Sequence, residues 1–500
     1  MTMTMTRTRT SGNAGMKGLA MTRRSFLMVS AGTLSGLGQK LFSAFPTDAV
    51  MENTPFQISL AEWSLNRAIR EGKLDNMDFP RVARERFKID CVEFVDQFFA
   101  DKAKDKSYLA ELKKRADNEG VRCGLIMVDT NGPLGVADKA ERDKAVEKTL
   151  PWIDAAAFLG CRAVRVNAYG VEDANALRGN IAESCARLAD YAADRKLDLC
   201  IENHGHLSSD PDWLASVMKA VGKPNFGTLP DFGNFPAETD RYDAVEKLMP
   251  FAKAVSAKCA EFNDDGSVKD VDFFRMMRIV RDGGYTGYVG IESCPPDADQ
   301  EFEAVAKTRD LLSRIREAEA KCKPLFNGRD LSGWVAIEGG DWTVENGVLI
   351  GRNGCNWTTN PETTGSWLRT EKIYGDFRLE LQYAINQGGN SGVFFRSAPE
   401  KNPAFTGYEM QIVDFFGQEP SKHGATAIYD LVPPMKNKVR PADEWNTVTI
   451  TARGPRIQFE INGELVLDSE QTRSMRGHIG LQNHDERAVV RFRNIRLQEL

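Results

Sequence analysis

The chain has 500 residues, of which 42% are hydrophobic and 27% charged, an ordinary composition for a soluble protein. The formal net charge of −6, with both signs interspersed, gives no reason to expect nucleic acid as a partner. Nine cysteines occur without C-x-x-C spacing, which argues against a disulfide framework or a zinc ribbon. At roughly 100–250 residues per domain, the length predicts two or three domains.

Residues 1–50 are typical of an export leader. The stretch MTRRSFLMVSAGTLSGLG pairs Arg23 and Arg24 with a following Phe26, Leu27 and a short apolar run, as twin-arginine signals do. A stray basic pair before a helix is the alternative. The apolar run is too short and too rich in glycine for a membrane span. We therefore expect a periplasmic or otherwise extracytoplasmic protein without a membrane span.

Residues 51–322 alternate short apolar strands with amphipathic helical segments such as 107–120 and 182–197. The pattern predicts a (β/α)8 TIM barrel, since eight strand-helix repeats fit this length. A doubly wound open sheet is the alternative, but no glycine-rich phosphate loop follows the first strand. The eight strands are predicted at 56–63, 91–98, 122–129, 161–169, 198–206, 226–234, 254–262 and 287–293.

Polar residues gather at the C-terminal ends of these strands, where TIM barrels carry their active sites. Three of them, here called the acidic cluster (Glu202, Asp231 and Glu292), end strands five, six and eight. Crowded carboxylates need a cation or protons, so we predict one divalent metal ion (Mn²⁺, Mg²⁺, Zn²⁺ or Co²⁺) with a histidine nitrogen as a further ligand. Separate caps and salt bridges are the alternative. The polar strand ends are Glu62, Glu93, Asp129, Asn167, Glu202, His204, Asp231, Lys258 and Glu292.

Roles for these residues follow from position and chemistry. If residues 200–206 are extended, Glu202, His204 and His206 point to one side, because strand side chains alternate. Lys258 could stabilise an enolate, act as an acid or base, or simply pair with a carboxylate. We assign to metal binding Glu202, His204, Asp231 and Glu292, to catalysis Glu202, Lys258 and Glu292, and to substrate binding Glu62, Glu93, Asn167 and His206.

Four stretches, IENHGHLSSDPDW, GTLPDFGNF, AVSAKCAEF and GYVGIES, resemble the sugar phosphate isomerase/epimerase family with a xylose isomerase-like barrel. The resemblance covers about residues 55–320 and implies a divalent metal held by the acidic cluster and a histidine. The usual histidine of strand seven falls at Ser256, and Asn234 stands where many members have a second one. Either His204 or His206 takes over, or the metal is weakly bound or absent. Because no basic run suggests a phosphate clamp, we expect a neutral sugar.

The rhythm changes at 317–334, and residues 323–500 read as a second domain. Strands are predicted at 342–351, 376–385, 391–398, 408–415, 445–453, 457–468 and 489–500, with an Asn-Gly hairpin signal at Asn462. Many short strands with almost no helical period predict an all-β jelly-roll sandwich.

Motifs of this second domain, including LFNGRDLSGW, GGNSGVFFRS, GYEMQIVD and ATAIYDLVPP, are similar to the 3-keto-disaccharide hydrolase domain with a concanavalin-like jelly roll. Within GYEMQIVD, Glu409 and Gln411 share one face of a strand, opposite Met410 and Ile412, and could hydrogen-bond sugar hydroxyls. A solvated outer face is the alternative. We assign to catalysis Arg396, Glu409, Gln411, Asp414 and His423, and to substrate binding Asn390, Ser391, Gln482 and His484.

Together the two resemblances imply an exported bifunctional enzyme acting on 3-keto-glycosides. A ketone at C3 acidifies the hydrogen at C2, so the sandwich would cleave the glycosidic bond by deprotonation and elimination, or by hydrolysis. The metal-dependent barrel would hydrate or isomerise the product through enolate chemistry. The alternatives are a sugar isomerase or epimerase with a carbohydrate-binding sandwich, and a non-catalytic glycan-binding envelope protein. The expected partner is a small carbohydrate, and the oligomeric state stays open.

Overall fold

The computed structural model describes residues 56–355 and 360–500. The export leader predicted at 1–50 lies outside the described residues. Within the described ranges, no helix combines the length and apolar character that crossing a membrane requires. The expected domain boundary at 322 and 323 falls between α9 (Glu301–Lys321) and β9 (Lys323–Pro324).

Eight parallel strands build the first domain in the spatial order β6-β5-β4-β3-β2-β1-β8-β7. Isolated bridges between Thr228 and Ala252 and between Asp231 and Ser256 join the two ends, so the barrel is nearly closed. The predicted barrel is confirmed. Its strands are β1 (Gln57–Ala61), β2 (Cys91–Val95), β3 (Arg122–Val128), β4 (Ala163–Val166), β5 (Asp198–Glu202), β6 (Phe226–Leu229), β7 (Val255–Cys259) and β8 (Tyr288–Ser293).

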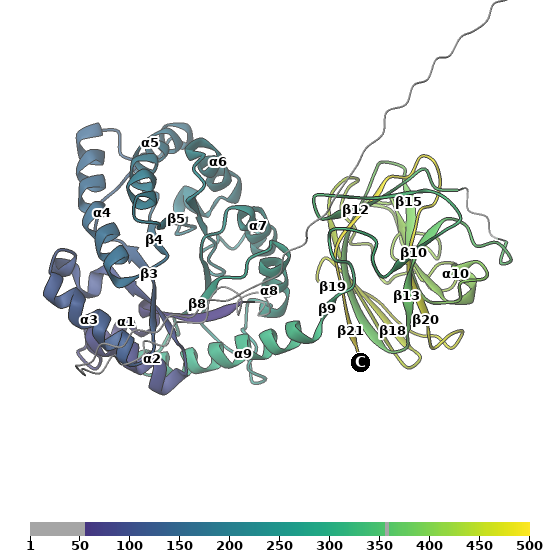
Figure 1. Ribbon diagram of the computed structural model, residues 1–500, viewed down its shortest axis with the longest axis horizontal. Coiled ribbons are helices and arrows are strands. Elements are labelled where there is room, and N and C mark those ends of the chain that lie inside the picture. The colour runs from purple at the N-terminus through teal and green to yellow at the C-terminus, as the bar shows by residue number, and fades with distance from the viewer. Residues whose placement is uncertain (1–55, 356–359) are drawn as a thin grey trace, which may run out of the picture. The chain divides into compact units, whose positions relative to one another are not determined.

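Helices follow the strands and surround the barrel (Figure 1). Each of the helices α3 to α8 begins after an aspartate whose side chain accepts a hydrogen bond from a first-turn amide, which satisfies an otherwise unpaired donor. The longer helices are α2 (Phe79–Phe87), α3 (Lys106–Asn118), α4 (Lys139–Leu159), α5 (Ala174–Ala193), α6 (Pro211–Val221), α7 (Arg241–Leu248), α8 (Phe273–Asp282) and α9, and α1 (Asn66–Arg70) is a short one.

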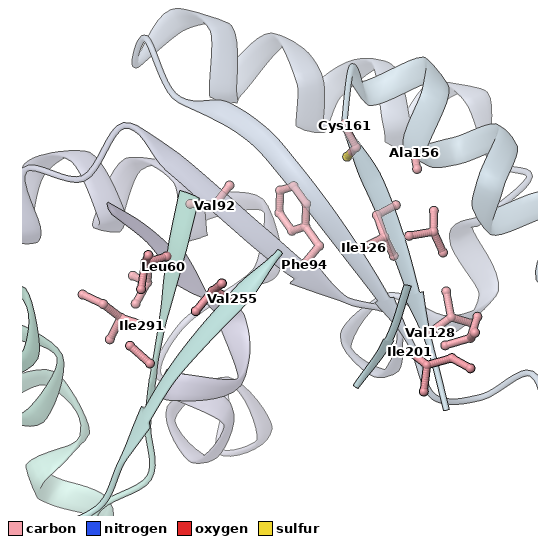
Figure 2. Packing of buried hydrophobic residues seen from close by; sticks show 14 of the residues in the cluster. Leu60, Val92, Phe94, Ile126, Val128, Ala156, Cys161, Ile201, Val255 and Ile291 are labelled. Carbon is pink, nitrogen blue, oxygen red and sulfur yellow. The ribbon is translucent and has the colours of Figure 1, made fainter. Parts of the chain in front are cut away.

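The barrel core lies between strands and helices (Figure 2). Val92 and Phe94 of β2 pack there with Ile126 and Val128 of β3. Because side chains alternate along a strand, Glu93 points the other way, into the barrel. The inward-facing positions also carry a smaller apolar cluster that includes Leu125 and Met127, so the polar residues inside the barrel lie next to apolar ones.

The second domain is built from two antiparallel sheets, which confirms the predicted sandwich. One sheet has the order β10-β13-β20-β15-β16, and the other runs β11-β12-β21-β14-β17-β18-β19. Their strands are β10 (Trp334–Ile337), β11 (Asp341–Glu345), β12 (Val348–Arg352), β13 (Trp367–Tyr374), β14 (Phe377–Ile385), β15 (Asn390–Ser397), β16 (Tyr408–Val413), β17 (Asn446–Arg453), β18 (Arg456–Ile461), β19 (Glu464–Glu470), β20 (Gly477–Gln482) and β21 (Val490–Glu499), and a short helix, α10 (Pro403–Thr406), precedes β16.

The five-stranded sheet has two different faces. Val393 of β15 and Met410 of β16 contribute to a hydrophobic core that both sheets share. Phe394 faces the other way and packs with Trp367 in a small separate cluster. The alternation that places Met410 in the core therefore places Glu409 and Gln411 on the outer face of this sheet.

Candidate active sites

The acidic cluster lies at the C-terminal ends of the barrel strands. Oxygen atoms of Glu202, Asp231 and Glu292 all lie within 4.8 Å of one another, and all three side chains are buried. Among the described residues, this is the one group of three or more His, Cys, Asp or Glu side chains with metal-binding spacing. The structure thus brings together the three carboxylates that the sequence placed in one site.

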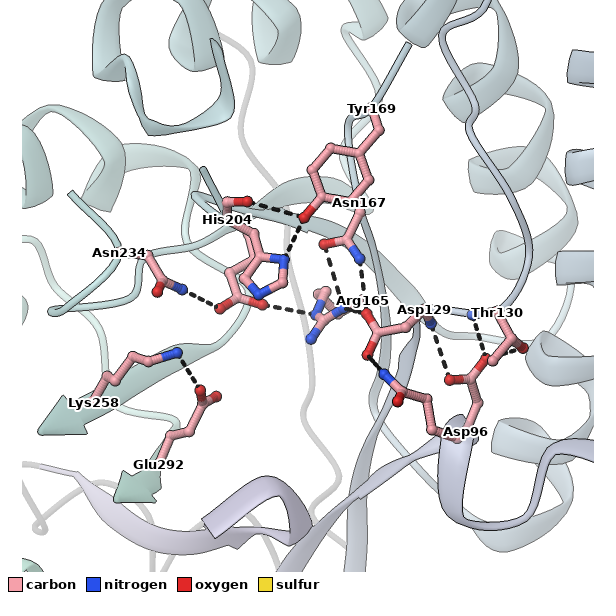
Figure 3. Close-up of polar contacts among 12 residues, drawn as sticks. Asp96, Asp129, Thr130, Arg165, Asn167, Tyr169, His204, Asn234, Lys258 and Glu292 are labelled. Atoms are coloured by element: carbon pink, nitrogen blue, oxygen red, sulfur yellow. Dashed lines mark hydrogen bonds and ion pairs between the residues drawn. The ribbon is translucent and has the colours of Figure 1, made fainter. Parts of the chain in front are cut away.

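Two cations neutralise part of this charge (Figure 3). Lys258 Nζ donates to Glu292 Oε1 at 2.6 Å, and Arg165 Nε lies 2.8 Å from Glu202 Oε2. Arg165 also pairs with Asp129, and its side chain is only 4% exposed. Sequence reasoning missed Arg165, although the signal was present. It is the one charged residue within the otherwise apolar strand AVRV, so its long side chain has to find partners inside the protein.

Neutral donors complete the surroundings of the acidic cluster. Asn234 Nδ2 donates to Glu202 Oε1 at 2.9 Å, and the backbone amides of Gly233 and Asn234 donate to Asp231 Oδ1 at 2.8 and 2.9 Å. Neither Asp231 Oδ2 nor Ser256 Oγ forms a well-aligned hydrogen bond within the described part of the chain. The Ser256 side chain nevertheless lowers the pKa of Asp231, so these two buried side chains interact with each other.

Burial governs the titration of this site. It raises the pKa of Glu202 and Asp231, while the charge of Arg165 lowers the first and the charge of Lys258 lowers the second. Burial also raises the pKa of Glu93 to about 7. Carboxyl groups with raised pKa values exchange protons near neutral pH, which suits them to acid-base catalysis.

Two further predicted binding residues have partners within the barrel. Glu62 is buried, accepts from Asn76 Nδ2 at 2.6 Å and from the amide of Val95 at 2.9 Å, and burial raises its pKa to about 8. Asn167 donates to Asp129 Oδ1 at 2.8 Å, beside Arg165. Asn167 therefore belongs to the polar network of Figure 3, whereas Glu62 ties β1 to its neighbouring segments.

The two histidines after β5 do not follow the predicted extended course. The strand ends at Glu202, Gly205 has φ +85°, and His206 (φ +49°) begins a 3-10 turn. The alternation that was expected to align Glu202, His204 and His206 therefore stops before His206. Nδ1 of His204 lies 2.6 Å from the Tyr169 hydroxyl, and burial lowers the pKa of His204. Neither histidine belongs to the carboxylate group, and the nitrogen ligand stays a prediction.

A divalent metal fits this donor set only in part. Three carboxylates supply the oxygen ligands that Mg²⁺ or Mn²⁺ prefers. However, the Lys258 ammonium already contacts Glu292, and the Arg165 guanidinium contacts Glu202. A metal ion would have to displace or tolerate both positive charges.

The second candidate site lies on the outer face of the five-stranded sheet. Gly392 of β15 lies directly opposite Gln411 of β16. On the other side of β15, Gln482 of β20 lies opposite Trp367 of β13. Phe394 lies opposite both Glu409 and Gly480. Register therefore collects amides, one carboxyl and aromatic rings on one face.

Glu409 is the one acidic member of this face and is only 3% exposed. With its amide oriented to satisfy both contacts, Gln411 donates to Glu409 Oε1 at 3.2 Å and to the carbonyl of Ser391 at 3.1 Å. A Cβ atom on Gly392 would lie 2.1 Å from Glu409 Oε1, so the glycine leaves the space that the carboxyl occupies. Burial raises the pKa of Glu409 well above its usual range, which favours the neutral acid.

Several polar atoms around Glu409 are buried and have no hydrogen-bond partner among the described residues. They are Asn390 Oδ1, Gln482 Oε1 and Trp367 Nε1. Unsatisfied buried polar atoms are rare in folded proteins, and a cluster of them indicates a place where a ligand completes the hydrogen bonds. Asn390 and Gln482 are among the binding residues assigned from the sequence, whereas Trp367 is not.

Two other residues assigned to this site lie elsewhere. Arg396 is fully buried, and its guanidinium donates to Asp376 Oδ1 and to the carbonyl of Gly375, both at 2.9 Å. The β15–β20 pairing is irregular near Arg396, and Arg396 has a φ of +53°. Its side chain therefore does not join Glu409 and Gln411 on the outer face of the sheet. Ser391 lies on the opposite face of β15 from Asn390 and donates to a backbone carbonyl at 2.8 Å. Both side chains stabilise the sheet in this structure.

The remaining three predicted residues make local contacts near the strand ends. Asp414 accepts from a backbone amide at 2.9 Å. His423 Nε2 lies 3.1 Å from Asp430, and His484 Nδ1 lies 3.0 Å from Asp485. Their catalytic and binding roles stay predictions.

Two known families match the chain. Residues 82–317 match the xylose isomerase-like TIM barrel, and residues 321–498 match the 3-keto-alpha-glucoside-1,2-lyase-like domain. The two resemblances seen in the sequence are thereby confirmed.

Individual relatives are distant. The 3-keto-disaccharide hydrolase of Bacteroides thetaiotaomicron is 25% identical over 166 residues, which cover 29% of this chain and 57% of the hydrolase. L-ribulose-5-phosphate 3-epimerase UlaE of Escherichia coli (strain K12) is 26% identical over 204 residues, covering 38% of this chain and 69% of the epimerase. The solved xylose isomerase domain protein from Planctomyces limnophilus is 16% identical, with a TM-score of 0.43 over 54% of this chain and 99% of that one. The chain therefore spans little more than half the length of the hydrolase.

Proposed function

Because the chain joins a xylose isomerase-like TIM barrel to a 3-keto-alpha-glucoside-1,2-lyase-like domain, we propose that it is an exported bifunctional enzyme acting on 3-keto-glycosides. The sandwich cleaves the glycosidic bond, and the barrel hydrates or isomerises the keto-sugar that results. The observation that carries this proposal is the buried carboxyl of Glu409, set among unsatisfied amide and indole groups on one sheet face.

Cleavage in the sandwich relies on proton transfer by Glu409. The ketone at C3 acidifies the C2 hydrogen, so a base can remove it and the C1–O bond then breaks as the C1–C2 double bond forms. The ionised form of Glu409 accepts the C2 proton, and the neutral acid that results donates this proton to the leaving oxygen. The raised pKa makes the carboxylate the stronger base for the first of these transfers. Gln411, Gln482 and Asn390 bind the sugar hydroxyls, and Trp367 offers an indole N–H and an aromatic surface.

The barrel performs the second step. Hydration of the elimination product, or its isomerisation, again moves a proton beside a carbonyl group. Carboxyls of Glu202 and Asp231 have pKa values raised by burial, and Lys258 places a positive charge beside them. A fixed positive charge stabilises an enolate oxygen, and the nearby carboxyls exchange the proton.

Export and metal binding are separate parts of this proposal. Export rests on the twin-arginine pattern of residues 1–50 alone. The acidic cluster comprises the residues that would hold a divalent ion, which would supply Lewis acidity to the barrel. Lys258 and Arg165 already pair with carboxylates of this cluster, which argues against a bound divalent ion.

The proposal is tested by incubating the purified chain in D2O with a 3-keto-glucoside and with the matching unoxidised glucoside. NMR then follows aglycone release and deuterium at C2. We expect release from the 3-keto-glucoside alone, with deuterium at C2 of the sugar product. Release without deuterium would replace elimination by direct hydrolysis, and binding without turnover would refute the enzyme.

A further inference from the structure

Lys258 lies within the acidic cluster rather than at its edge. In the parallel ladder of β7 and β8 it is directly opposite Glu292, and its Nζ donates to that carboxylate at 2.6 Å. The stem of the lysine passes over Gly233, where an added Cβ would lie 3.0 Å from Cγ and 3.1 Å from Cδ of Lys258. Gly233, two residues after Asp231, thus makes room for the lysine to reach the carboxylates.

The position of this ammonium group matters because it takes space and charge that a metal ion would need. A divalent ion bound by carboxylates sits about 2.0–2.6 Å from its oxygen ligands. Lys258 Nζ already occupies such a place beside Glu292. Its side chain is 19% exposed and that of Glu292 is 5% exposed, so neither group can turn freely into solvent.

Other groups of the site leave little for a metal. Arg165 holds one oxygen of Glu202 and Asn234 Nδ2 holds the other. His204, the predicted nitrogen ligand, has its Nδ1 against the Tyr169 hydroxyl. Asp231 Oδ2 is buried without a well-aligned partner in the described chain, and the Ser256 side chain lies beside this carboxyl.

We propose that Lys258 is the resident cation of the barrel and takes the place of a divalent metal among Glu202, Asp231 and Glu292. An ammonium group has three N–H donors, of which one serves Glu292, so the others remain for an oxygen of the sugar. This last role rests on the proposed function, whereas the exclusion of metal does not.

Metal titration of the full chain tests the exclusion directly. After treatment with EDTA and dialysis, Mn²⁺ binding is measured by the electron paramagnetic resonance of free Mn²⁺, without sugar present. We expect no stoichiometric Mn²⁺ site in the wild-type chain. Lys258→His removes the ammonium and adds a nitrogen ligand, so it should gain one stoichiometric Mn²⁺ site that wild type lacks. Lys269→His, at an exposed lysine paired with Glu261, is the matched control and should gain no site.

Lys258→Gln guards against a folding defect, because it keeps much of the side-chain volume and removes the charge. It should also gain Mn²⁺ affinity, with circular dichroism confirming the fold. One Mn²⁺ in wild type that Glu202→Gln loses would overturn the proposal. Absence of binding in both folded Lys258 variants would overturn it too, because Lys258 would then not be what excludes the ion.

Activity separates this result from the proposed function. If Lys258 binds the sugar, Lys258→Gln keeps aglycone release but loses conversion of the released keto-sugar. Conversion that survives in Lys258→Gln would refute the sugar-binding role. Failure of wild type to release any aglycone would refute the proposed function and leave the Mn²⁺ titration to decide the cation.

Discussion

The two candidate sites solve one problem, a carboxyl group inside a protein, in different ways. In the barrel, Arg165 and Lys258 are paired with Glu202 and Glu292, so charge is compensated by charge. In the sandwich, burial alone shifts the pKa of Glu409, and a proton neutralises the carboxyl. The first arrangement keeps a field that can stabilise an enolate, whereas the second keeps a proton that can be moved.

The largest expected effect concerns the proton of the sandwich. Glu409→Gln preserves shape and neutrality but removes the transferable proton, so aglycone release should fall by roughly 10²- to 10⁴-fold. Release is measured with the 3-keto-glucoside substrate. Glu202→Gln in the barrel is the control and should leave release unchanged. If Glu409→Gln released the aglycone at the wild-type rate, a proton-transfer role for Glu409 would be refuted.

Compensation in the barrel is tested by removing its buried cation. Arg165→Met leaves Glu202 and Asp129 without their partner, which should lower the free energy of unfolding by about 3–5 kcal/mol. Denaturant unfolding followed by the helical circular dichroism signal reports on the barrel. Arg187→Met, which breaks an exposed pair with Asp143, should cost less than about 1 kcal/mol. Equal effects of the two substitutions would show that the buried pair is not special.

Filling the space beside the Glu409 carboxyl should have a smaller effect on stability. In Gly392→Ala the new Cβ would come within 2.1 Å of Glu409 Oε1, so the carboxyl has to move. We expect slower aglycone release and a loss of about 1–3 kcal/mol in stability. Gly375→Ala is the control, since its Cβ would lie 3.7 Å from the nearest atom, the carbonyl oxygen of Met475. A Gly392→Ala variant as active as Gly375→Ala would mean that the position of Glu409 is not critical.

The smallest expected effect is the change in the free energy of unfolding per pH unit. The unfolded chain releases the Glu409 proton near pH 4.5, while the folded sandwich retains it to higher pH. Stability from the neutral acid is therefore complete below pH 4.5 and is lost as pH rises through the folded pKa. Relative to Glu409→Gln, wild type should lose about 1.4 kcal/mol per pH unit in that window. Unfolding curves of both proteins at several pH values measure the difference, and a constant difference would contradict a raised pKa.

Much of the fold was predictable because its signals are local. Each of the eight barrel strands lies within its predicted range, since apolar runs bounded by helices are hard to mistake. Three strands of the five-stranded sheet, β10, β13 and β20, were not predicted. An irregularity between Arg369 and Ile373 interrupts β13, and two glycines weaken the alternation in β20.

Site residues were predictable from the sequence only where they lie near the ends of strands. Glu202, Asp231, Glu292 and Lys258 lie within two residues of the C-terminal ends of their strands, and the barrel geometry gathers such residues. Arg165 lies within its strand, and its partners come from elements distant in sequence, so spacing could not pair them. In the sandwich, the side chain of Arg396 leaves the outer face of the sheet because the strand pairing is irregular there. No local sequence pattern predicts that irregularity.

The near-closure of the barrel places a seam between β6 and β7, beside the acidic cluster. Between β6 and β7 the ladder is reduced to isolated bridges, one of them between Asp231 and Ser256. Few backbone hydrogen bonds cross there, so this seam is where the barrel should open first during local fluctuations. Amide hydrogen exchange should therefore be faster at Ser256 than within the β1–β8 ladder. Local opening between β6 and β7 would change the distance between Asp231 and Lys258 while the rest of the barrel stays intact.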